Sequence, residues 1–489
     1  MMENLAFENL NLSVLTPMII LSSGALGIIC IDIVKSGLSR SFYAMLSILF
    51  LVMSLAFVII SDTNVYGFFN MIVVDGIAKL AQIIILVASL LFAPLILSGK
   101  EFDEHRFAEY FAFLLFAVVG FLFMVSTNNL ILIFVGLETA SLALYTMIAM
   151  HNKSNAIEAA LKYFTMGALS SGFFAMGAMI LYALTSSADI DIIVQTLAQK
   201  NFEPMAATLG ALAFILASFA FKLSIVPFHT WTPDVYEGSS AALAGYMSVV
   251  PKTAGFIVVI RLFETLIGEQ LAWANDMLYV LAVITMTLSN LMALVQSDVK
   301  RMLAFSSISH VGFILCAVLV NSKQANEAIF LYLTLFMFVN FGAFTLLWIA
   351  RNKENLYDER YQHPYSKFSG MIKVAPIGAV IMALFMLSLA GIPPFSVFWG
   401  KIYIMSVAIQ EGFIILAIIM ALNSAIAIYY YLKLIVFMFL KEPLQANGTV
   451  YIENASRPLM VIVGIAAITA VAAMFFVEPI ITAIDYYLY

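Results

Sequence analysis

The sequence is poor in charge and almost free of cysteine. Only 11% of its 489 residues are charged, and 63% are hydrophobic. The two cysteines, Cys30 and Cys316, stand alone, and neither belongs to a CxxC pair or to a cluster with histidine. This shortage argues against a disulfide scaffold, structural zinc and iron–sulfur ligation. The net charge of −6 offers no basic surface, so we expect no nucleic-acid partner.

Long apolar runs make up most of the chain, and its mean hydropathy is +1.02. A bilayer core of about 30 Å needs about 20 apolar residues per helix, and runs of that length recur between short polar breaks. We therefore predict an all-α, polytopic membrane protein with about 14 transmembrane helices. The predicted spans are 12–34, 41–60, 76–97, 107–126, 130–150, 157–184, 205–235, 241–267, 277–294, 302–320, 328–350, 374–409, 413–440 and 458–481.

Basic residues predict the orientation of these spans, because short cytoplasmic loops carry an excess of lysine and arginine. If the N-terminus lies outside, only Lys200 and Lys323 fall in outer loops. The inner loops then hold Lys35, Arg40, Lys100, Arg106, Lys153, Lys300, Arg301, Arg351, Lys353, Arg360, Lys367, Lys373, Lys441 and Arg457. We therefore expect both termini to lie on the outer side of the membrane, which is the periplasmic side in a bacterial cytoplasmic membrane.

Two of the predicted spans are too long and are interrupted by proline. In span 205–235 the break falls at Pro227, and in span 374–409 it falls at Pro393 and Pro394. An interior proline removes a helical hydrogen bond and clashes with the preceding turn. These spans are the seventh and the twelfth, five apart, so the pattern predicts two copies of a five-helix unit.

The two predicted copies insert with opposite orientations, because five is an odd number. Inverted repeats with one discontinuous helix each are typical of ion-coupled transporters, where the break lines a hydrated cavity. The predicted division is three N-terminal helices in 1–106, a first antiporter-like repeat of spans 4–8 in 107–270, a second inverted repeat of spans 9–13 in 271–440, and a C-terminal helix in 441–489.

Three ionisable residues lie deep within the first predicted repeat. Glu138 stands eight residues into its span, or about 12 Å deep. Lys222 precedes the break at Pro227, and Lys252 follows Pro251 in the middle of the eighth span. A charge at a helix centre costs roughly 2.5 to 3.5 kcal/mol, so each is a candidate functional residue. The alternatives are a structural ion pair for Glu138, and snorkelling or helix capping for the lysines.

Three further candidates lie in the second repeat and near a span edge. Lys401 follows the second break, with a structural role as its alternative. His310 stands about 12 Å deep in the polar tenth span and is a candidate proton relay or a hydrogen-bonded structural histidine. Lys162 lies nearer the inner surface, where snorkelling is the alternative. The other basic residues within spans fall towards span ends, and we expect them to be snorkelling anchors: Lys79, Arg261 and Lys433.

Together these groups form a row through consecutive helices. Burial favours the neutral form of an ammonium group and a nearby carboxylate favours the charged form, so such a row can pass protons. Substrate binding is less favoured, because the pattern implies no apolar pocket with convergent donors. A scaffold in which the charges only lock helices together is a further alternative. The residues predicted to carry protons are Glu138, Lys162, Lys222, Lys252, His310 and Lys401.

A long motif surrounds the first break. Residues 221–239 read Phe-Lys-Leu-Ser-Ile-Val-Pro-Phe-His-Thr-Trp-Thr-Pro-Asp-Val-Tyr-Glu-Gly-Ser. This stretch resembles the antiporter-like membrane subunits of complex I. Its Trp-Thr-Pro-Asp-Val-Tyr portion most specifically resembles subunit N of bacterial NADH-quinone oxidoreductase, the counterpart of mitochondrial NADH dehydrogenase subunit 2. The resemblance continues over nearly the whole chain, at residues 136–138, 161–164, 299–310, 390–393 and 400–401.

The resemblance implies a role for individual residues. It implies that Glu138 and Lys222 form a modulating pair and that Lys162 and Lys252 continue the first half-channel. It also implies that Lys401 is the terminal proton site of the second. Sister subunits carry a glutamate at this last site or a long lateral C-terminal helix, so a lysine here favours subunit N.

The resemblance also implies a function and partners. The chain would be a non-redox subunit of NADH:quinone oxidoreductase, a translocase that moves protons as electrons pass through other subunits. Its partners would be neighbouring antiporter-like and small membrane subunits, together with lipid and protons. No cofactor is expected on this chain, whereas the complex uses NADH or another donor, FMN, iron–sulfur clusters and quinone. A Mrp-type cation/proton antiporter subunit would use the same residues and is the alternative.

Overall fold

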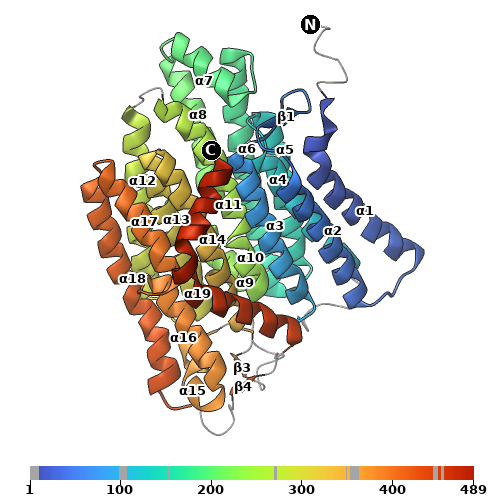
Figure 1. The fold of residues 1–489 in the computed structure, drawn as a ribbon, viewed down its shortest axis with the longest axis vertical. Coiled ribbons are helices and arrows are strands. Elements are labelled where there is room, and N and C mark those ends of the chain that lie inside the picture. The colour runs from blue at the N-terminus through green and yellow to red at the C-terminus, as the bar shows by residue number, and fades with distance from the viewer. Residues whose placement is uncertain are drawn as a thin grey trace.

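The apolar runs form long helices that lie side by side in one bundle (Figure 1). The computed structural model describes residues 10–98, 107–151, 153–268, 272–348, 350–352, 363–443, 450–452 and 456–488. The elements of the first half are a 3₁₀ turn at Leu12–Leu15, α1 (Thr16–Val34), α2 (Arg40–Ile60), β1 (Val65–Gly67), β2 (Ile72–Val74), α3 (Gly76–Ile96), α4 (Phe107–Val125), α5 (Leu130–Ala149), α6 (Ser154–Thr185), α7 (Ile190–Gln199), α8 (Met205–Leu223), α9 (Trp231–Gly238), α10 (Ala241–Met247) and α11 (Val250–Gly268).

The second half repeats this all-helical organisation. Its elements are α12 (Ala272–Leu294), α13 (Val299–Val320), α14 (Lys323–Leu346), β3 (Ala350–Asn352), a 3₁₀ turn at Tyr365–Phe368, α15 (Met371–Val374), α16 (Pro376–Ala390), α17 (Ser396–Gln410), α18 (Ile414–Leu440), β4 (Val450–Ile452) and α19 (Arg457–Leu488). The strands form two short antiparallel pairs, β1 with β2 and β3 with β4.

The membrane-spanning architecture predicted from the sequence is confirmed. Within the described ranges, thirteen helices are long and apolar enough to cross a membrane. The remaining predicted span corresponds to α16 and α17, which have 15 residues each. Neither half would cross a bilayer core alone, because about 20 residues are needed. The two halves together supply the broken twelfth span.

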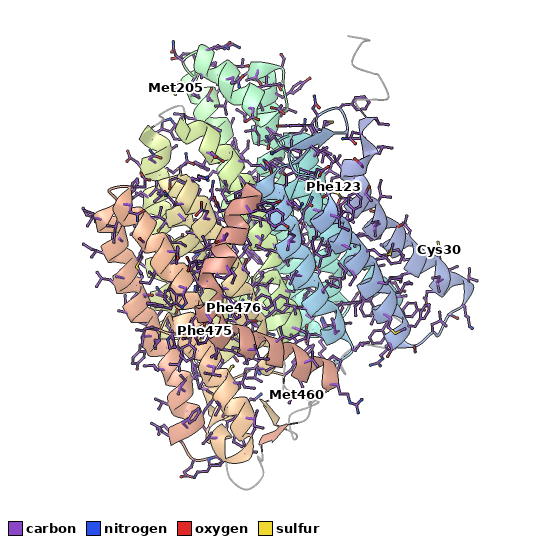
Figure 2. All side chains as sticks on the ribbon, in the orientation of Figure 1. Cys30, Phe123, Met205, Met460, Phe475 and Phe476 are labelled. Atoms are coloured by element: carbon purple, nitrogen blue, oxygen red, sulfur yellow. The ribbon has the colours of Figure 1, made fainter. Side chains whose placement is uncertain are left out.

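The outer surface of the bundle is apolar. Figure 2 shows Phe475 and Phe476 on α19, and their side chains are 69% and 55% exposed. Ile468 on the same helix and Tyr429 on α18 are exposed to 69% and 65%. Exposed apolar area of this extent is rare on monomeric soluble proteins and marks a surface that meets lipid or another membrane protein.

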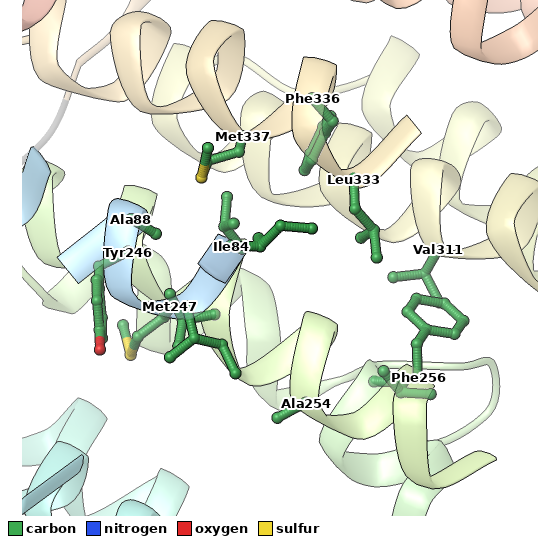
Figure 3. Close-up of a cluster of buried hydrophobic side chains, with 14 of the residues drawn as sticks. Ile84, Ala88, Tyr246, Met247, Ala254, Phe256, Val311, Leu333, Phe336 and Met337 are labelled. Atoms are coloured by element: carbon green, nitrogen blue, oxygen red, sulfur yellow. The ribbon is translucent and has the colours of Figure 1, made fainter. Parts of the chain in front are cut away.

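The centre of the bundle is a tightly packed apolar cluster. Figure 3 shows side chains of this cluster, with Tyr246 and Met247 of α10 at one side, Val311 of α13 beside Phe256 of α11 at the other, and Phe336 on α14. All five side chains are buried. Because lipid tails are as apolar as these side chains, close van der Waals packing, rather than transfer out of water, stabilises such an interior.

The two broken spans are interrupted by backbone turns of the same kind. Helix α8 ends at Ser224 and α16 ends at Gly391, and both residues adopt the left-handed conformation, with φ of 64° and 79°. The next amide returns to a carbonyl five residues earlier, at 2.7 Å in the first break and 3.1 Å in the second. A cis proline follows three residues after each cap, at Pro227 and Pro394. The left-handed cap and its hydrogen bond end each half-helix in the same way.

The helix starts of the two units also match. Asn129 caps α5 and forms a β-bridge to Asp189, while Asp298 caps α13 and forms a β-bridge to Pro364. Side-chain oxygens of Asn and Asp satisfy the first free amides of a helix. These paired features support the repeat. The predicted unit boundaries at 106 and 270 fall outside the described residues, so the division of the chain stays a prediction.

Two features of the fold differ from the sequence prediction. The eighth span is not continuous, because residues Ser248 and Val249 separate α10 from α11. The sequence offered one signal for this break, since Pro251 fits the first turn of a new helix. The short helix α7, at the upper end of Figure 1, was not predicted at all.

Candidate functional site

Lys222 lies at the end of α8, directly before the first break, and is 3% exposed. Its ammonium group donates a hydrogen bond to Ser141 Oγ of α5 at 2.7 Å and lies 3.5 Å from Tyr163 Oη of α6. The Ser141 hydroxyl in turn donates to the carbonyl of Leu137 at 2.5 Å. The lysine is therefore held by neutral oxygens from two neighbouring helices.

Glu138 and Lys222, the predicted modulating pair, make no direct ion pair with each other. Its side chain is half-buried, and among the described residues it forms no ion pair and its Oε1 has no hydrogen-bond partner. Residues three apart share a helix face, so Ser141 lies on the same side of α5 and makes the contact in its place. Sequence reasoning could not tell which of the two would reach the lysine.

Trp231, the first residue of α9, contacts the end of α8 across the first break. Its indole N–H donates to the carbonyl of Phe221 at 2.9 Å, and its ring stacks on Tyr163 with centroids 4.4 Å apart. The hydroxyls of Ser224 and Thr232 also meet across the break at 2.5 Å. The second half-helix is thus bonded to the residues around Lys222.

Lys252 is the third residue of α11 and lies in the middle of the apolar span Ala241–Glu264, as predicted. It is 3% exposed, and its ammonium group donates to the Ser307 carbonyl at 2.8 Å and to Ser307 Oγ at 2.7 Å. Ser307 lies on α13, so this lysine crosses from the first repeat to the second. The prediction did not include the division of this span into α10 and α11, which places Lys252 in the first turn of a helix.

His310 is buried on α13, as predicted, and is 3% exposed. Its Nδ1 lies 2.5 Å from Tyr332 Oη of α14, and its Nε2 lies 3.1 Å from Tyr431 Oη of α18. Both ring nitrogens therefore have a phenol partner. Neither tyrosine was predicted, since they stand 22 and 121 residues away in the chain.

Lys401 lies on α17, just after the second break, and is 2% exposed. Its ammonium group donates to the carbonyls of Leu389 and Ala390, each at 3.1 Å, and to Ser424 Oγ at 3.0 Å. Those carbonyls belong to the last turn of α16, where helical partners end. The lysine thus bridges the two halves of its own broken span.

Lys162 lies at the exposed edge of the bundle. Its side chain is 44% exposed and forms ion pairs with Glu158 at 2.9 Å and with Asp234 at 3.2 Å. Arg301 holds the other oxygen of Asp234 at 2.9 Å. The position fits an entrance to the row better than a link within it.

Two of the expected snorkelling anchors are buried instead. Lys79 is 4% exposed and donates to the Ser61 carbonyl at 2.6 Å. Arg261 makes two hydrogen bonds of 2.8 Å to the carboxylate of Asp75, which joins α11 to the start of α3. Bidentate arginine pairs have fixed geometry, so this contact holds the N-terminal helices against the first repeat. Lys433 is half-buried and donates to the Gln296 carbonyl at 3.1 Å.

The polar side chains that sequence reasoning missed are mostly hydroxyls. Ser141, Tyr163, Tyr332, Tyr431 and Ser424 each contact a predicted site residue. Hydroxyl residues are common in apolar helices, where they also bond to their own backbone. For that reason a hydroxyl residue in the sequence does not by itself indicate a site contact. Only Ser141 could have been suggested, because it is three residues from Glu138 and so shares its helix face.

No group of three or more His, Cys, Asp or Glu side chains is arranged to hold a metal within the part of the chain that the structure describes. The buried groups contact one another through hydroxyl, phenol, amine and imidazole atoms. Such groups can bind and release protons or pass them along hydrogen bonds. That this chain carries no cofactor stays a prediction.

Comparison with known proteins identifies the family. Residues 127–427 match the family described as NADH:quinone oxidoreductase/Mrp antiporter, TM. The chain is 54% identical over 485 residues to NADH-quinone oxidoreductase subunit N of Sulfurovum sp., covering 99% of this chain and 98% of that protein. A chain in the structure of respiratory complex I from Thermus thermophilus with bound aureothin has a TM-score of 0.80 and 26% identity, over 96% of this chain and 99% of that one.

A chain of the Mrp complex from Dietzia sp. shares the fold, with a TM-score of 0.78 and 19% identity over 98% of both chains. At that identity the likeness concerns the fold alone. The match to the Sulfurovum protein is much stronger and covers both chains almost completely. This chain therefore belongs to the subunit N family of bacterial NADH-quinone oxidoreductases.

Proposed function

We propose that this chain is a proton-translocating membrane-arm subunit of a respiratory NADH:quinone oxidoreductase, a translocase driven by electron transfer in other subunits. NADH or another donor, FMN, iron–sulfur clusters and quinone would act in those other subunits. Neighbouring antiporter-like and small membrane subunits would cover part of the apolar surface. The protons would pass through buried lysines, with His310 of the second repeat between Lys252 and Lys401.

One observation carries this proposal. Lys222, Lys252 and Lys401 are each at most 3% exposed and lie beside helix breaks, and within the described residues none of them contacts a carboxylate. Their partners are neutral hydroxyl and carbonyl oxygens. An ammonium group buried without a counter-ion is costly to keep charged. A lysine used only as a structural anchor would be expected to have a carboxylate partner.

The remaining predicted residues take different places in the proposal. Lys162, half-exposed at the bundle edge, is the proposed entrance, since water can reach its ammonium group. Glu138 is the proposed modulating charge. It lies on α5 one helical turn from Ser141, the residue that contacts Lys222, and acts without a direct ion pair. A nearby carboxylate still favours the charged form of an amine in a low-dielectric interior.

The lower end of Figure 1 is the proposed cytoplasmic side. Helix α15 and the start of α19 lie towards that end, and they carry Lys373 and Arg457. Helix α7 at the upper end is followed by Lys200. This distribution follows the positive-inside tendency. Labelling of single cysteines placed in α7 and α15, from one side of sealed vesicles, tests the orientation.

The main experiment replaces Lys222 with Ala in the assembled complex. NADH-driven proton uptake into inverted membrane vesicles should fall by at least about tenfold, which corresponds to about 1.4 kcal/mol. Electron transfer from NADH to an artificial acceptor should stay intact, because it does not involve this subunit. Lys373→Ala is the matched control, since Lys373 is exposed and pairs with exposed Glu442. Normal pumping in Lys222→Ala would refute the proposal.

A cation/proton antiporter subunit of Mrp type is the second candidate, and the shared fold favours keeping it. Purification separates the two. Co-isolation with flavin and iron–sulfur subunits supports the oxidoreductase, whereas antiport activity in vesicles that lack those subunits supports the antiporter.

A further inference from the structure

Both ring nitrogens of His310 are engaged by buried phenols. Tyr332 contacts Nδ1 at 2.5 Å and Tyr431 contacts Nε2 at 3.1 Å. The three side chains are each no more than 3% exposed. A neutral imidazole has one donor and one acceptor nitrogen. One phenol must therefore donate to the ring while the other accepts from it.

The contact continues beyond the histidine. Tyr431 Oη also lies 2.5 Å from Ser306 Oγ, so Ser306, Tyr431, His310 and Tyr332 form one unbroken series of hydrogen bonds. A hydroxyl can both donate and accept a hydrogen bond. All the hydrogen bonds of this series can therefore run in one direction along it or all in the other. The arrangements differ in which ring nitrogen carries the proton.

The two ends of this series lie near two buried lysines, Lys252 of the first repeat and Lys401 of the second. Ser306 is adjacent to Ser307, which binds the ammonium group of Lys252 at 2.7 Å. At the other end, the Tyr332 ring packs on the residue before Lys401, where a side-chain carbon added at Gly400 would lie 2.8 Å from that ring. The four groups therefore lie between the lysine at the end of the first repeat and the lysine of the second.

The surroundings of the series are apolar. The Phe336 ring lies 4.7 Å from the imidazole, centroid to centroid. Figure 3 shows Phe336, and Val311 next to His310 in the chain, within the buried apolar cluster. Among apolar neighbours, the hydroxyls are the polar groups that the imidazole can exchange protons with.

We propose that Tyr332 and Tyr431 relay protons onto and off His310, an inference that rests on the proposed function. Tyr431 gives its hydroxyl proton to Nε2 and takes one from Ser306, which is refilled through water from the Lys252 side. The proton on Nδ1 passes to Tyr332, whose own hydroxyl proton leaves through water towards Lys401. Each oxygen loses one proton and gains one, so no phenolate forms. Rotation of the hydroxyls and exchange of the ring tautomer restore the first arrangement.

The test removes one hydroxyl at a time in the assembled complex. Tyr431→Phe and Tyr332→Phe keep the ring packing and should each lower NADH-driven proton transport by about tenfold or more, within the range of a lost proton-transfer partner. Tyr246→Phe is the matched control. Its buried hydroxyl likewise meets a serine hydroxyl, that of Ser89, at 3.1 Å, whereas the ring nitrogens of His310 meet Tyr332 and Tyr431. This control should transport protons normally.

A double-mutant cycle separates relay from support. If the tyrosines act through His310, adding Tyr431→Phe to His310→Ala should cause no further loss, whereas independent effects would add. The solvent deuterium isotope effect on transport should also change in Tyr431→Phe and not in Tyr246→Phe. All rates are normalised to the amount of assembled complex, and Tyr332→Phe on a separate helix decides the question if Tyr431→Phe assembles poorly.

Several results would overturn the inference. These are normal transport in both tyrosine variants, losses equal to that of Tyr246→Phe, and losses that add fully to that of His310→Ala. Such results would leave the proposed function standing as long as Lys222→Ala still abolishes pumping. Pumping in Lys222→Ala would instead remove the proposed function on which the relay depends.

Discussion

The two breaks contain the same kind of backbone turn, but their buried lysines lie on opposite sides of it. Lys222 precedes the first turn, whereas Lys401 follows the second. In the first repeat the lysine precedes the break and binds hydroxyls on α5 and α6. In the second it follows the break and binds the last carbonyls of α16. The first lysine joins α8 to α5 and α6, whereas the second joins the two halves of its own broken span to each other and, through Ser424 Oγ, to α18. A repeated turn can therefore host a buried cation in two ways, and the surroundings decide which helices it links.

Removing each lysine should have unequal effects on stability. Lys401→Met leaves the carbonyls of Leu389 and Ala390 without this donor, at a cost of about 1–3 kcal/mol for each buried group left unpaired. Lys222→Met leaves a Ser141 hydroxyl that still donates to Leu137. The amount and melting temperature of the purified complex should fall for the first and change little for the second. Equal losses of stability in the two variants would show that the carbonyls of Leu389 and Ala390 do not make Lys401 the more important lysine for stability.

The caps of the two breaks should also respond differently. Gly391 has φ of 79°, and a side-chain carbon there would lie 2.8 Å from Lys401 Cδ. Gly391→Ala should therefore cost about 1–2 kcal/mol for the left-handed backbone alone, and it should also displace the lysine and lower proton transport. Ser224→Ala keeps a residue with Cβ at that conformation and loses only the hydroxyl contact to Thr232. A Gly391→Ala complex as stable and active as Ser224→Ala would contradict this expectation.

The helix caps at Asn129 and Asp298 extend the comparison to the repeat starts. Asn129 accepts from two amides of α5, whereas Asp298 accepts from two amides of α13 and from the amide of His363. Loss of a cap costs about 0.5–2 kcal/mol, so both alanine variants should melt earlier, Asp298→Ala by more. Burial raises the pKa of the Asp298 carboxyl. Asp298→Asn should therefore be the mild control, and a loss equal to that of Asp298→Ala would argue against the cap.

The smallest effect on stability is expected at Lys162, where the contrast is between exposed and buried lysines. Its ion pairs with Glu158 and Asp234 are exposed, and such pairs contribute about 0–1 kcal/mol. Lys162→Gln should leave the melting temperature almost unchanged and slow proton transport less than Lys222→Ala does. Initial rates of proton uptake in vesicles measure this. Complete loss of transport would mean that the burial of a lysine does not predict how strongly its replacement slows proton transport.

Much of the architecture could be predicted because its signals are local. Apolar runs of sufficient length predict spans, and proline within such a run predicts a break, as at Pro227 and Pro394. The division between α10 and α11 was missed because Pro251 is equally compatible with a continuing apolar run when only the sequence is read. Its position in the first turn of α11 becomes informative once the preceding backbone is seen.

The site was predicted less completely than the fold, because its contacts join residues far apart in the chain. The lysines and His310 are conspicuous as polar residues in apolar runs. Their partners are ordinary serines and tyrosines, and nothing local indicates that Tyr431 reaches a histidine 121 residues earlier. That Glu138 modulates Lys222 stays a prediction. The spacing identifies the face of α5 that Glu138 and Ser141 share, but not that Ser141 makes the contact with the lysine.

The bonded position of Trp231 gives the molecule an internal optical probe. Its indole is tied to the Phe221 carbonyl and stacked on Tyr163, next to Lys222. The chain has four tryptophans, so replacing the other three with phenylalanine would leave one emitter at the first break. Any rearrangement there during turnover would change the wavelength and quenching of its fluorescence, and the motion of this half-helix could be followed in real time without an added dye.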